Sequence, residues 1–235
     1  MSRTYAIADL HGRADLLQAA LEAIAAHAEG EPGTVVTIGD YVDRGPESAQ
    51  IIRRLREGLS DGWKLVCLQG NHEAMMLETL LLPLHPDWWI GNGGGATLVS
   101  YGHPARGAYD PTVVPQEDID WLKALPLIYV DEHRVFVHAG VDPTIPLEEQ
   151  TAKTMQWMLY PDGFAGGHGQ RHVVHGHHQF AEGPMLYAGR SDFDTFAWAT
   201  GQLAVGVFDD DKPGGPVDII EVILARDPRY LEEFA

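Results

Sequence analysis

Three features of the sequence predict an α/β fold (mixed α+β) with two β-sheets. In the first third, short apolar runs alternate with helical runs, the pattern of parallel strands joined by helical crossovers. Helices become rare in the later half, so its apolar runs indicate a second sheet, mixed or antiparallel. The 235 residues are 45% apolar and 21% charged, which is typical of a globular chain that buries a full core without disulfides.

The first third repeats a strand–loop–helix unit three times. Each unit begins with an apolar strand and passes through a polar loop into a helix. In the first helix, Leu16, Leu17, Ala20, Leu21 and Ile24 recur at helical spacing. The expected strands are residues 4–7, 34–38 and 64–68, and the expected helices are residues 14–28, 48–57 and 73–82.

Residues 83–126 interrupt this alternation with Trp88, Trp89 and a run of three glycines. We expect a small helical insertion here, with helices near 96–101 and 116–124, inside one domain of residues 1–235. The two tryptophans are expected to pack within it. After the insertion we expect a helix at 148–158 and strands at 127–130, 135–138, 172–175, 185–188, 203–208 and 217–224.

The charge balance excludes several classes of partner. Sixteen lysines and arginines against 34 acidic residues give a net charge of -18, which argues against binding to nucleic acid or to an anionic membrane. The longest apolar stretch, 80–84, contains a proline and is too short to span a membrane. We expect no signal peptide, because the first apolar run leads directly into Asp9 and His11, and the single cysteine, Cys67, indicates a reducing compartment. We therefore expect a cytoplasmic protein, and its oligomeric state stays open.

Polar residues follow the expected strands at the point where each strand ends. Asp9 and His11 follow the first strand, Asp40 and Asp43 the second, and Asn71 and His72 the third; His138 and His177 follow two later strands. Ligands of open α/β sheets bind at the carboxyl ends of the strands. Five such ends in one sheet would bring these side chains together.

The chemistry of this set predicts a metal centre. The chain has 12 histidines and 26 glycines; histidine is a common metal ligand, and glycine permits tight loops. Asp9, His11, Asp40, Asn71, His138 and His177 offer only oxygen and nitrogen, which suits manganese, iron or zinc. Six ligands with one bridging carboxylate suit two divalent ions, and we expect manganese. Two such ions can hold a bridging hydroxide that attacks a phosphate ester.

The order of these blocks resembles the PPP family of metallophosphatases, within the calcineurin-like metallophosphoesterases. The blocks are Asp9–Gly12, Gly39–Gly45, Gly70–Glu73, His138–Gly140 and Gly176–His177. Residues 89–102 and Asp194-Thr195 are similar to the bacterial serine/threonine protein phosphatase branch. The resemblance covers roughly residues 5–208. It implies a four-layer αββα sandwich of two mixed sheets flanked by helices, which agrees with the two-sheet interpretation.

The resemblance also implies a role for each matched residue. Asp43 and His72 would form a carboxylate–imidazolium pair in which His72 protonates the leaving oxygen, and Arg44 would grip the phosphate. Asn71 would contact substrate as well as metal. Asp9 and His11 would hold the first ion, Asp40 would bridge both, and Asn71, His138 and His177 would hold the second.

Two departures from the family pattern bear on the substrate. The branch has an arginine, a second phosphate clamp, where this chain has Leu159; Arg171 or Arg190 could replace it. It also has threonine after Gly-His, where this chain has His178. We expect a serine/threonine, or dual-specificity, protein phosphatase. The alternatives are a symmetrical diadenosine tetraphosphate hydrolase, which Glu73 and His178 argue against, and a weakly active phosphoprotein-binding module, which Leu159 favours.

The remaining histidines have a simpler interpretation. For His175 we expect packing or hydrogen bonding more than metal contact. His168 and His172 are expected to be polar loop residues.

Overall fold

The computed structural model describes residues 2–82 and 86–226 and contains two five-stranded mixed sheets, as the sequence predicts. The first sheet has the order β10-β9-β1-β2-β3. Strands β1, β2 and β3 are parallel, and β9 runs antiparallel to both β1 and β10. Its strands are β1 (Arg3–Ile7), β2 (Thr34–Thr37), β3 (Lys64–Cys67), β9 (Gln202–Asp209) and β10 (Asp218–Ile223).

The second sheet has the order β4-β5-β6-β8-β7. Its central strands β5, β6 and β8 are parallel, and the outer strands β4 and β7 are antiparallel to their neighbours. Its strands are β4 (Ile128–Val130), β5 (Arg134–Val137), β6 (His172–His175), β7 (Met185–Leu186) and β8 (Arg190–Asp192).

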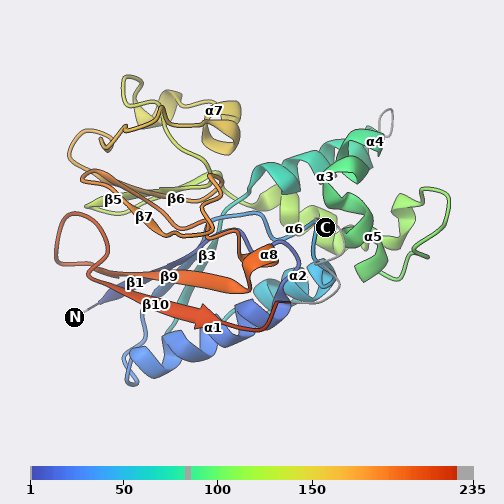
Figure 1. Cartoon of the computed structure of the whole chain (residues 1–235), viewed down its shortest axis with the longest axis horizontal. Helices are drawn as coiled ribbons and strands as arrows, with labels where there is room; N and C mark the ends of the chain where they lie inside the picture. Colours follow the sequence, from blue (N-terminus) through green and yellow to red (C-terminus); the bar gives the residue numbers. More distant parts are fainter. Residues whose placement is uncertain (1, 83–85, 227–235) are drawn as a thin grey trace.

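Helices cover the outer faces of the two stacked sheets. Helix α1 (Ala14–His27) lies below the first sheet in Figure 1, and α7 (Ala152–Trp157) lies above the second. The order of layers is therefore helix, sheet, sheet, helix, the predicted sandwich. Helices α1 and α2 (Ser48–Glu57) are the crossovers from β1 to β2 and from β2 to β3, α3 (Asn71–Leu81) follows the edge strand β3, and the short α8 (Ala197–Thr200) precedes β9.

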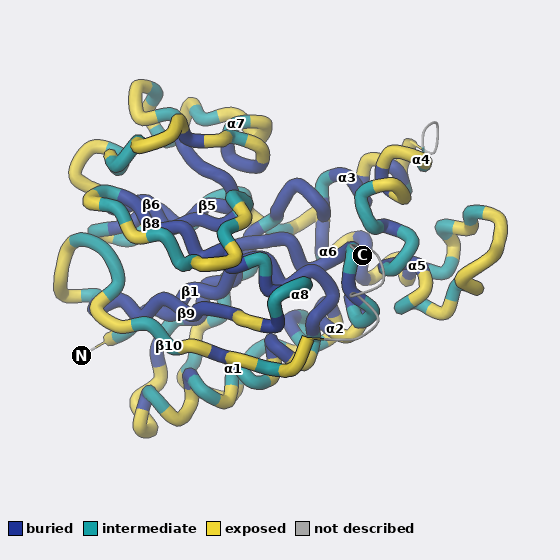
Figure 2. The backbone as a smooth tube through the Cα atoms, in the orientation of Figure 1, coloured by how far each residue is buried: buried dark blue, intermediate teal, exposed yellow. Residues whose placement is uncertain are grey.

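The side-chain alternation of the strands divides the core into three parts. Tyr5 and Ile7 of β1 face the helices, and Ala6 between them faces the second sheet. In β5, Phe136 points to the inter-sheet core, and Val135 and Val137 point to the α7 side. Strands buried on both faces explain the continuous apolar runs in the sequence, and Figure 2 shows these strands as buried along most of their length.

The segment that follows α3 consists mainly of short helices. Its expected start at residue 83 lies outside the described residues. The described part places α4 and α5 beyond α3 on one side of the molecule (Figure 1). Its elements are α4 (Pro86–Trp89), a kinked turn η1 (Ile90–Gly94) with non-helical backbone at Gly93, α5 (Gly95–Ser100), a 3-10 turn η2 (Pro111–Val113) and α6 (Gln116–Ala124).

Several expectations about single elements are wrong. The expected helix at 148–158 is a 3-10 turn η3 (Leu147–Glu149) followed by the six-residue α7. Strand β8 has the polar sequence Arg-Ser-Asp, which gives no apolar signal. Strands β9 and β10, expected in the second sheet, belong to the first, where β9 pairs with β1 and β10 pairs with β9. Across residues 2–82 and 86–226, no helix has the length and apolar character that crossing a membrane would require.

Candidate metal centre

The expected site residues meet in one cleft, and both sheets contribute to it. Asp9, Asp40 and Asn71 follow β1, β2 and β3 of the first sheet, whereas His138 and His177 follow β5 and β6 of the second. The expectation that one sheet supplies all five strand ends is therefore wrong. The cleft has a volume of about 360 Å³ and is lined by Asp9, Asp40, Arg44, Asn71, His72, Leu159, His177, His178 and Gln179.

The backbone is strained at the same residues. Eight described non-glycine residues have a positive φ, and six of them belong to the expected site. Such conformations each cost about 1–3 kcal/mol and cluster at functional sites. The loops therefore adopt unfavourable conformations where they aim these side chains, whose φ angles are 43° at Asp9, 41° at His11, 54° at Asp40, 73° at Asp43, 65° at Arg44 and 69° at His177.

Asp40 lies between two groups of possible ligands. Its Oδ2 is 3.4 Å from Nε2 of His11, and its Oδ1 is 3.4 Å from Nε2 of His138. Two clusters of potential ligands share it, His11–Asp40–His72 and Asp40–His138–His177. A carboxylate whose two oxygens face different histidines is arranged to bridge two cations.

Backbone carbonyls orient the histidines toward Asp40. The Nδ1 atoms of His11 and His138 donate to the carbonyls of Val42 and Ile38, at 2.9 and 3.0 Å. Each Nε2 is therefore left with its lone pair facing the cleft, the tautomer that metal ligation requires. Burial lowers the pKa of His11 and His138, and burial together with His138 lowers that of His177 to about 3. Neutral imidazoles of this kind bind metal without first losing a proton.

The two remaining expected ligands, Asn71 and Asp9, lie beside His138 and His177, respectively. Oδ1 of Asn71 is 2.7 Å from Nε2 of His138, so two lone-pair atoms point at one place, as ligands of one ion do. Asp9 is buried, and its carboxylate accepts from the backbone N–H of His177 at 3.2 Å. A Cβ on Gly176 would lie 1.9 Å from Oδ2 of Asp9, so only glycine fits beside this carboxylate.

Asp9 does not belong to either ligand cluster found among the described residues. Burial raises its pKa, and the nearby carboxylates of Asp194 and Asp40 raise it further. Burial and the Asp40 charge likewise raise the pKa of Asp194 to about 7. Crowded, buried carboxylates of this kind are stabilised by cations. The donor types, the orientation of the imidazoles and the excess of negative charge fit a pair of divalent metal ions.

His72 and Asp43 form the expected pair. Nδ1 of His72 is 2.7 Å from Oδ2 of Asp43, so Nε2 of His72 is directed into the cleft, 4.0 Å from Asp40. Burial lowers the pKa of His72, but the carboxylates of Asp40 and Asp43 outweigh it and the net pKa lies above the usual value. Asp43 is itself held by Nε1 of Trp89 at 2.9 Å and by Oγ1 of Thr97 at 2.8 Å.

Arg44 is the only arginine or lysine among the residues that line the cleft. Its guanidinium lies 2.9 Å from Nε2 of His11 and 3.3 Å from Nε2 of His72. Leu159 lies at the cleft and is 66% exposed. Arg190 is buried against Phe164 and His175, and Arg171 bonds to the carbonyl of Asp131. Neither arginine lines the cleft, so neither supplies the second clamp in this structure.

Glu73 has a role that the sequence interpretation missed. Its carboxylate accepts hydrogen bonds from the backbone N–H groups of Asp40, Tyr41, Val42 and Gly70, at 2.7 to 3.2 Å. It thus ties the β2 loop, which carries Asp40, to the start of α3, which carries Asn71 and His72. The sequence signal was a glutamate three residues into a helix that follows a glycine.

The other histidines and tryptophans have structural contacts. His175 is buried and bonds to Arg190, as the packing interpretation expects. His168 bonds to the carbonyl of Ile145. His172 is a buried residue of β6 that bonds to Ser191, so the strand expected at 172–175 is confirmed and the competing expectation that His172 is a loop residue is wrong. Trp89 packs in the core, but Trp88 is 51% exposed and stacks on Trp157.

Curated relatives give a first comparison. The chain is 30% identical over 169 residues to the symmetrical bis(5'-nucleosyl)-tetraphosphatase of Cronobacter sakazakii, in an alignment that covers 68% of this chain and 52% of the relative. The same protein of Klebsiella pneumoniae is 31% identical over an alignment of the same length and coverage. The chain spans about half the length of these curated relatives.

Solved structures and a family model give the second comparison. A protein described provisionally as a diadenosine tetraphosphatase superimposes with a TM-score of 0.66 at 22% identity, covering 94% of this chain and 93% of that one. A serine/threonine protein phosphatase of Saccharomyces cerevisiae superimposes with a TM-score of 0.56 at 13% identity, covering 97% and 81%. Both show likeness of fold. The family model for calcineurin-like phosphoesterases matches residues 2–208, so the chain belongs to the calcineurin-like phosphoesterase family.

Proposed function

We propose that this chain is a metal-dependent hydrolase of phosphoric esters or anhydrides. The observation that carries the proposal is Asp40, whose two carboxylate oxygens face His11 and His138 in separate ligand clusters. This arrangement supports a dinuclear centre, which suits an anionic phosphate on an otherwise acidic protein. We propose Asp9, His11, Asp40, Asn71, His138 and His177 as its ligands, with manganese as the expected metal.

The side chains around the centre would bind the phosphate and protonate the leaving group. Two divalent ions would supply Lewis acidity, activating water and offsetting the charge on the phosphate oxygens. Arg44 would bind a further phosphate oxygen, and Asn71, which also lines the cleft, would contact the substrate. Asp43 holds the Nδ1 of His72, so Nε2 can deliver a proton to the leaving oxygen as the bond to phosphorus breaks.

For the substrate, we propose dinucleoside polyphosphates cleaved symmetrically. The curated relatives carry this activity in their names. Glu73 no longer argues against a diadenosine tetraphosphate hydrolase. Its carboxylate accepts hydrogen bonds from four backbone N–H groups and does not line the cleft. His178 lines the cleft, but its Nε2 bonds to the carbonyl of Met158.

A protein phosphatase, the preferred interpretation of the sequence, is the second candidate. The observation that favours it is a group of exposed apolar side chains near the cleft, Trp88, Trp157 and Leu159, which are 51%, 37% and 66% exposed. Leu159 lines the cleft, the Trp157 ring lies 6.2 Å from the ring of His177, and Trp88 stacks on Trp157. Exposed apolar side chains beside a catalytic cleft suit a peptide. The phosphoprotein-binding module requires a site that binds without hydrolysis, and the intact pair of His72 and Asp43 does not support it.

One experiment tests the metal centre. Protein reloaded with manganese should contain two ions per chain by elemental analysis, and chelators should abolish hydrolysis of p-nitrophenyl phosphate. Asp40→Asn should lower both the metal content and the activity, because one residue serves both ligand clusters. Asp61→Asn, in the exposed turn before β3, is the matched control. One tightly bound ion with full activity would contradict the two-ion proposal.

A second experiment tests the substrate. The same preparation is given diadenosine tetraphosphate, phosphoserine peptides and p-nitrophenyl phosphate, and the products are separated by chromatography. We expect two ADP per tetraphosphate, with the highest kcat/KM on this substrate. Release of ATP and AMP would exclude symmetrical cleavage, and a higher kcat/KM on the peptides would favour the protein phosphatase.

A further inference from the structure

A second cavity, of about 560 Å³, adjoins the metal cleft. Cleft and cavity share two lining residues, Arg44 and Gln179. The volume lies within the range of about 300–1,000 Å³ typical of small-molecule sites. The remaining walls come from the η1 turn and the start of α5 on one side and from Phe196 and Trp198, at α8, on the other. A ligand held in the cleft can therefore extend past Arg44 into this space.

Arg44 stands at the boundary between the two spaces. Its guanidinium is within 3.3 Å of His72 on the cleft side and lies 5.4 Å from the centroid of the Trp198 ring on the other. Its backbone N–H donates to the carbonyl of Gly93. A Cβ on Gly93 would lie 2.6 Å from the Arg44 nitrogen, and the φ of Gly93 is 105°, so this wall requires glycine. The boundary is thus formed by closely packed backbone.

The aromatic walls suit a flat ring. Phe196 and Trp198 lie edge to face, with ring centroids 5.0 Å apart and planes at 81°. Trp198 is 6% exposed and has Arg44 over its ring, whereas Phe196 is half-buried, so a planar heterocycle can stack on Phe196 while its edge meets Trp198. Such stacking is tolerant of the base identity. Arg44 is the only charged side chain among the residues that line this cavity. The interior therefore suits an uncharged base, whereas the phosphates attached to it would stay beside Arg44.

We propose that this cavity, the aromatic cavity, binds the nucleoside of the departing nucleotide, with its base against Phe196 and Trp198. The proposal rests on the proposed function. We assign the cavity to the departing nucleotide, and not to the nucleotide whose phosphorus is attacked, because of the position of His72. His72, the proposed proton donor to the leaving oxygen, is adjacent to Arg44, and the aromatic cavity begins at Arg44. Water adds to the scissile phosphorus and loses one proton, the bond to the leaving oxygen of the diphosphate breaks, and His72 supplies the proton that this oxygen takes up. The proton lost by the water restores His72 through the solvent, so the step balances.

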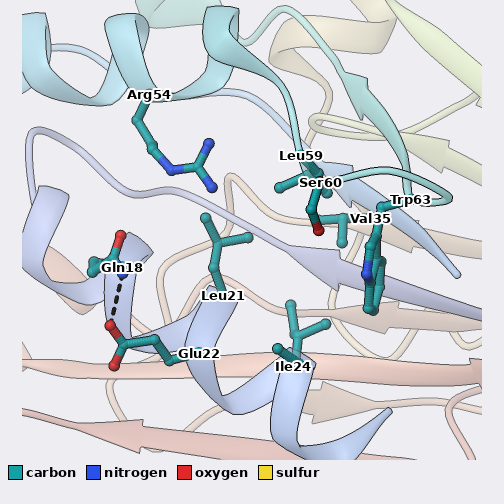
Figure 3. Close-up of a pocket in the computed structure, with 10 residues that line it drawn as sticks. Gln18, Leu21, Glu22, Ile24, Val35, Arg54, Leu59, Ser60 and Trp63 are labelled. Atoms are coloured by element: carbon teal, nitrogen blue, oxygen red, sulfur yellow. Dashed lines mark hydrogen bonds between the residues drawn. The ribbon is translucent and has the colours of Figure 1, made fainter. Parts of the chain in front are cut away.

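Two other cavities are competing locations for the base. One lies between α1 and the turn before β3, lined by Leu21, Arg54 and Trp63 (Figure 3). It has a volume of about 250 Å³ and shares no lining residue with the cleft. The other is lined by the stacked Trp88 and Trp157 and also shares no lining residue with the cleft. Only the aromatic cavity, of these three, continues into the cleft.

The test compares Phe196→Leu and Trp198→Leu with Trp63→Leu and Trp88→Leu. Loss of one base-stacking contact predicts a decrease of about 5- to 150-fold in kcat/KM for diadenosine tetraphosphate. For p-nitrophenyl phosphate, which has no base, the decrease should be far smaller. Equal losses on both substrates, or a selective loss in Trp88→Leu with none in Phe196→Leu, would overturn the proposal.

Product inhibition tests the aromatic cavity without relying on cleavage of the dinucleotide. ADP and inorganic pyrophosphate are compared as inhibitors of p-nitrophenyl phosphate hydrolysis, and ADP binding is measured separately by calorimetry. ADP should bind more tightly than pyrophosphate in the unmodified protein, and Phe196→Leu should remove most of that preference. Trp63→Leu should retain it. If diadenosine tetraphosphate is not cleaved but the preference for ADP over pyrophosphate is observed and depends on Phe196, the proposed substrate is wrong and the proposed nucleoside site is retained. If the unmodified protein shows no preference for ADP over pyrophosphate, the proposed nucleoside site is wrong.

Discussion

At the scale of single residues, hydrogen bonds from residues outside the cleft fix the orientation of the side chains that line the site. Asp43 holds His72, and Trp89 and Thr97 in turn hold Asp43. Carbonyl groups of Val42 and Ile38 hold His11 and His138 in the same way. Such supporting bonds fix the tautomer and direction of each imidazole. The chemistry therefore depends on residues that never touch the substrate.

His72→Asn should lower kcat on alkyl phosphates by about 10²–10⁴-fold, the usual contribution of a general acid. The loss should be smaller for p-nitrophenyl phosphate, because its leaving group departs readily without a proton. Elemental analysis is the control, since His72 belongs to one ligand cluster with His11 and Asp40. Loss of metal in the variant, or equal losses of kcat on both substrates, would show that His72 acts as a ligand rather than as an acid.

Leu159→Arg should strengthen inhibition by inorganic phosphate. Arg190 is buried and Arg171 is bonded elsewhere, so within residues 2–82 and 86–226 no second arginine lines the cleft. A hydrogen bond to a charged group contributes about 1.5–3 kcal/mol, which converts to roughly 10- to 150-fold in the inhibition constant. Leu159→Lys provides a charge without the planar donor fork and should have a smaller effect. An unchanged constant in both variants would mean that Arg44 and the metal ions suffice.

At the scale of elements, helix α3 is joined to the loop after β2. Glu73 lies in its first turn and accepts from four backbone N–H groups, which belong to two different loops. Asn71 and His72 lie in the same turn, and Asp40 and Asp43 lie in the joined loop. The relative position of the metal ligands and the proton donor therefore depends on one buried carboxylate.

Glu73→Gln should lower the free energy of unfolding by about 1–3 kcal/mol, because one amide nitrogen would face backbone donors and leave them without an acceptor. Metal affinity should also fall, since the loop that carries Asp40 loses its anchor. Urea unfolding and metal titration measure the two effects. Glu78→Gln, an exposed position on the same helix, is the control. Comparable effects in both variants would contradict the anchoring role.

At the scale of the whole molecule, the two sheets bury polar residues as well as apolar ones. His172 of β6 is 3% exposed and bonds to Ser191 of β8 at 2.8 Å. Burial, together with the positive charge of Arg134, lowers its pKa to about 4. The folded protein therefore holds this imidazole neutral over a pH range in which the unfolded chain protonates it.

Stability should consequently decrease as the pH falls from about 6.5 towards 4. In that window the unfolded chain binds a proton at His172 that the folded protein does not, which contributes a slope of at most about 1.4 kcal/mol per pH unit. His172→Gln keeps a group able to bond Ser191 but removes the titration. Urea unfolding measures the free energy of unfolding at each pH, relative to the value of the same protein at pH 8. Between about pH 6.5 and pH 4 this free energy should decrease less steeply for His172→Gln than for the unmodified chain. Parallel pH profiles would contradict this assignment.

The sequence by itself determined the parts of this protein that local patterns encode. Apolar periodicity placed the first three strands and helices to within a few residues, because a strand buried on both faces and an amphipathic helix each have a local signature. Polar residues at strand ends, such as Asp40 and His138, were predicted to meet, and the structure places them 3.4 Å apart. Their roles as ligands remain predictions.

Only the tertiary structure decided what depends on pairing between distant segments. Backbone hydrogen bonds place β9 beside β1, although about 195 residues separate them along the chain. The polar strand β8 is recognisable only by its pairing with β6. The same holds for the site: Arg190 packs inside, Glu73 joins two loops, and Phe196 lines the aromatic cavity together with Arg44. Side-chain packing and strand order arise from contacts between distant residues, which no local pattern records.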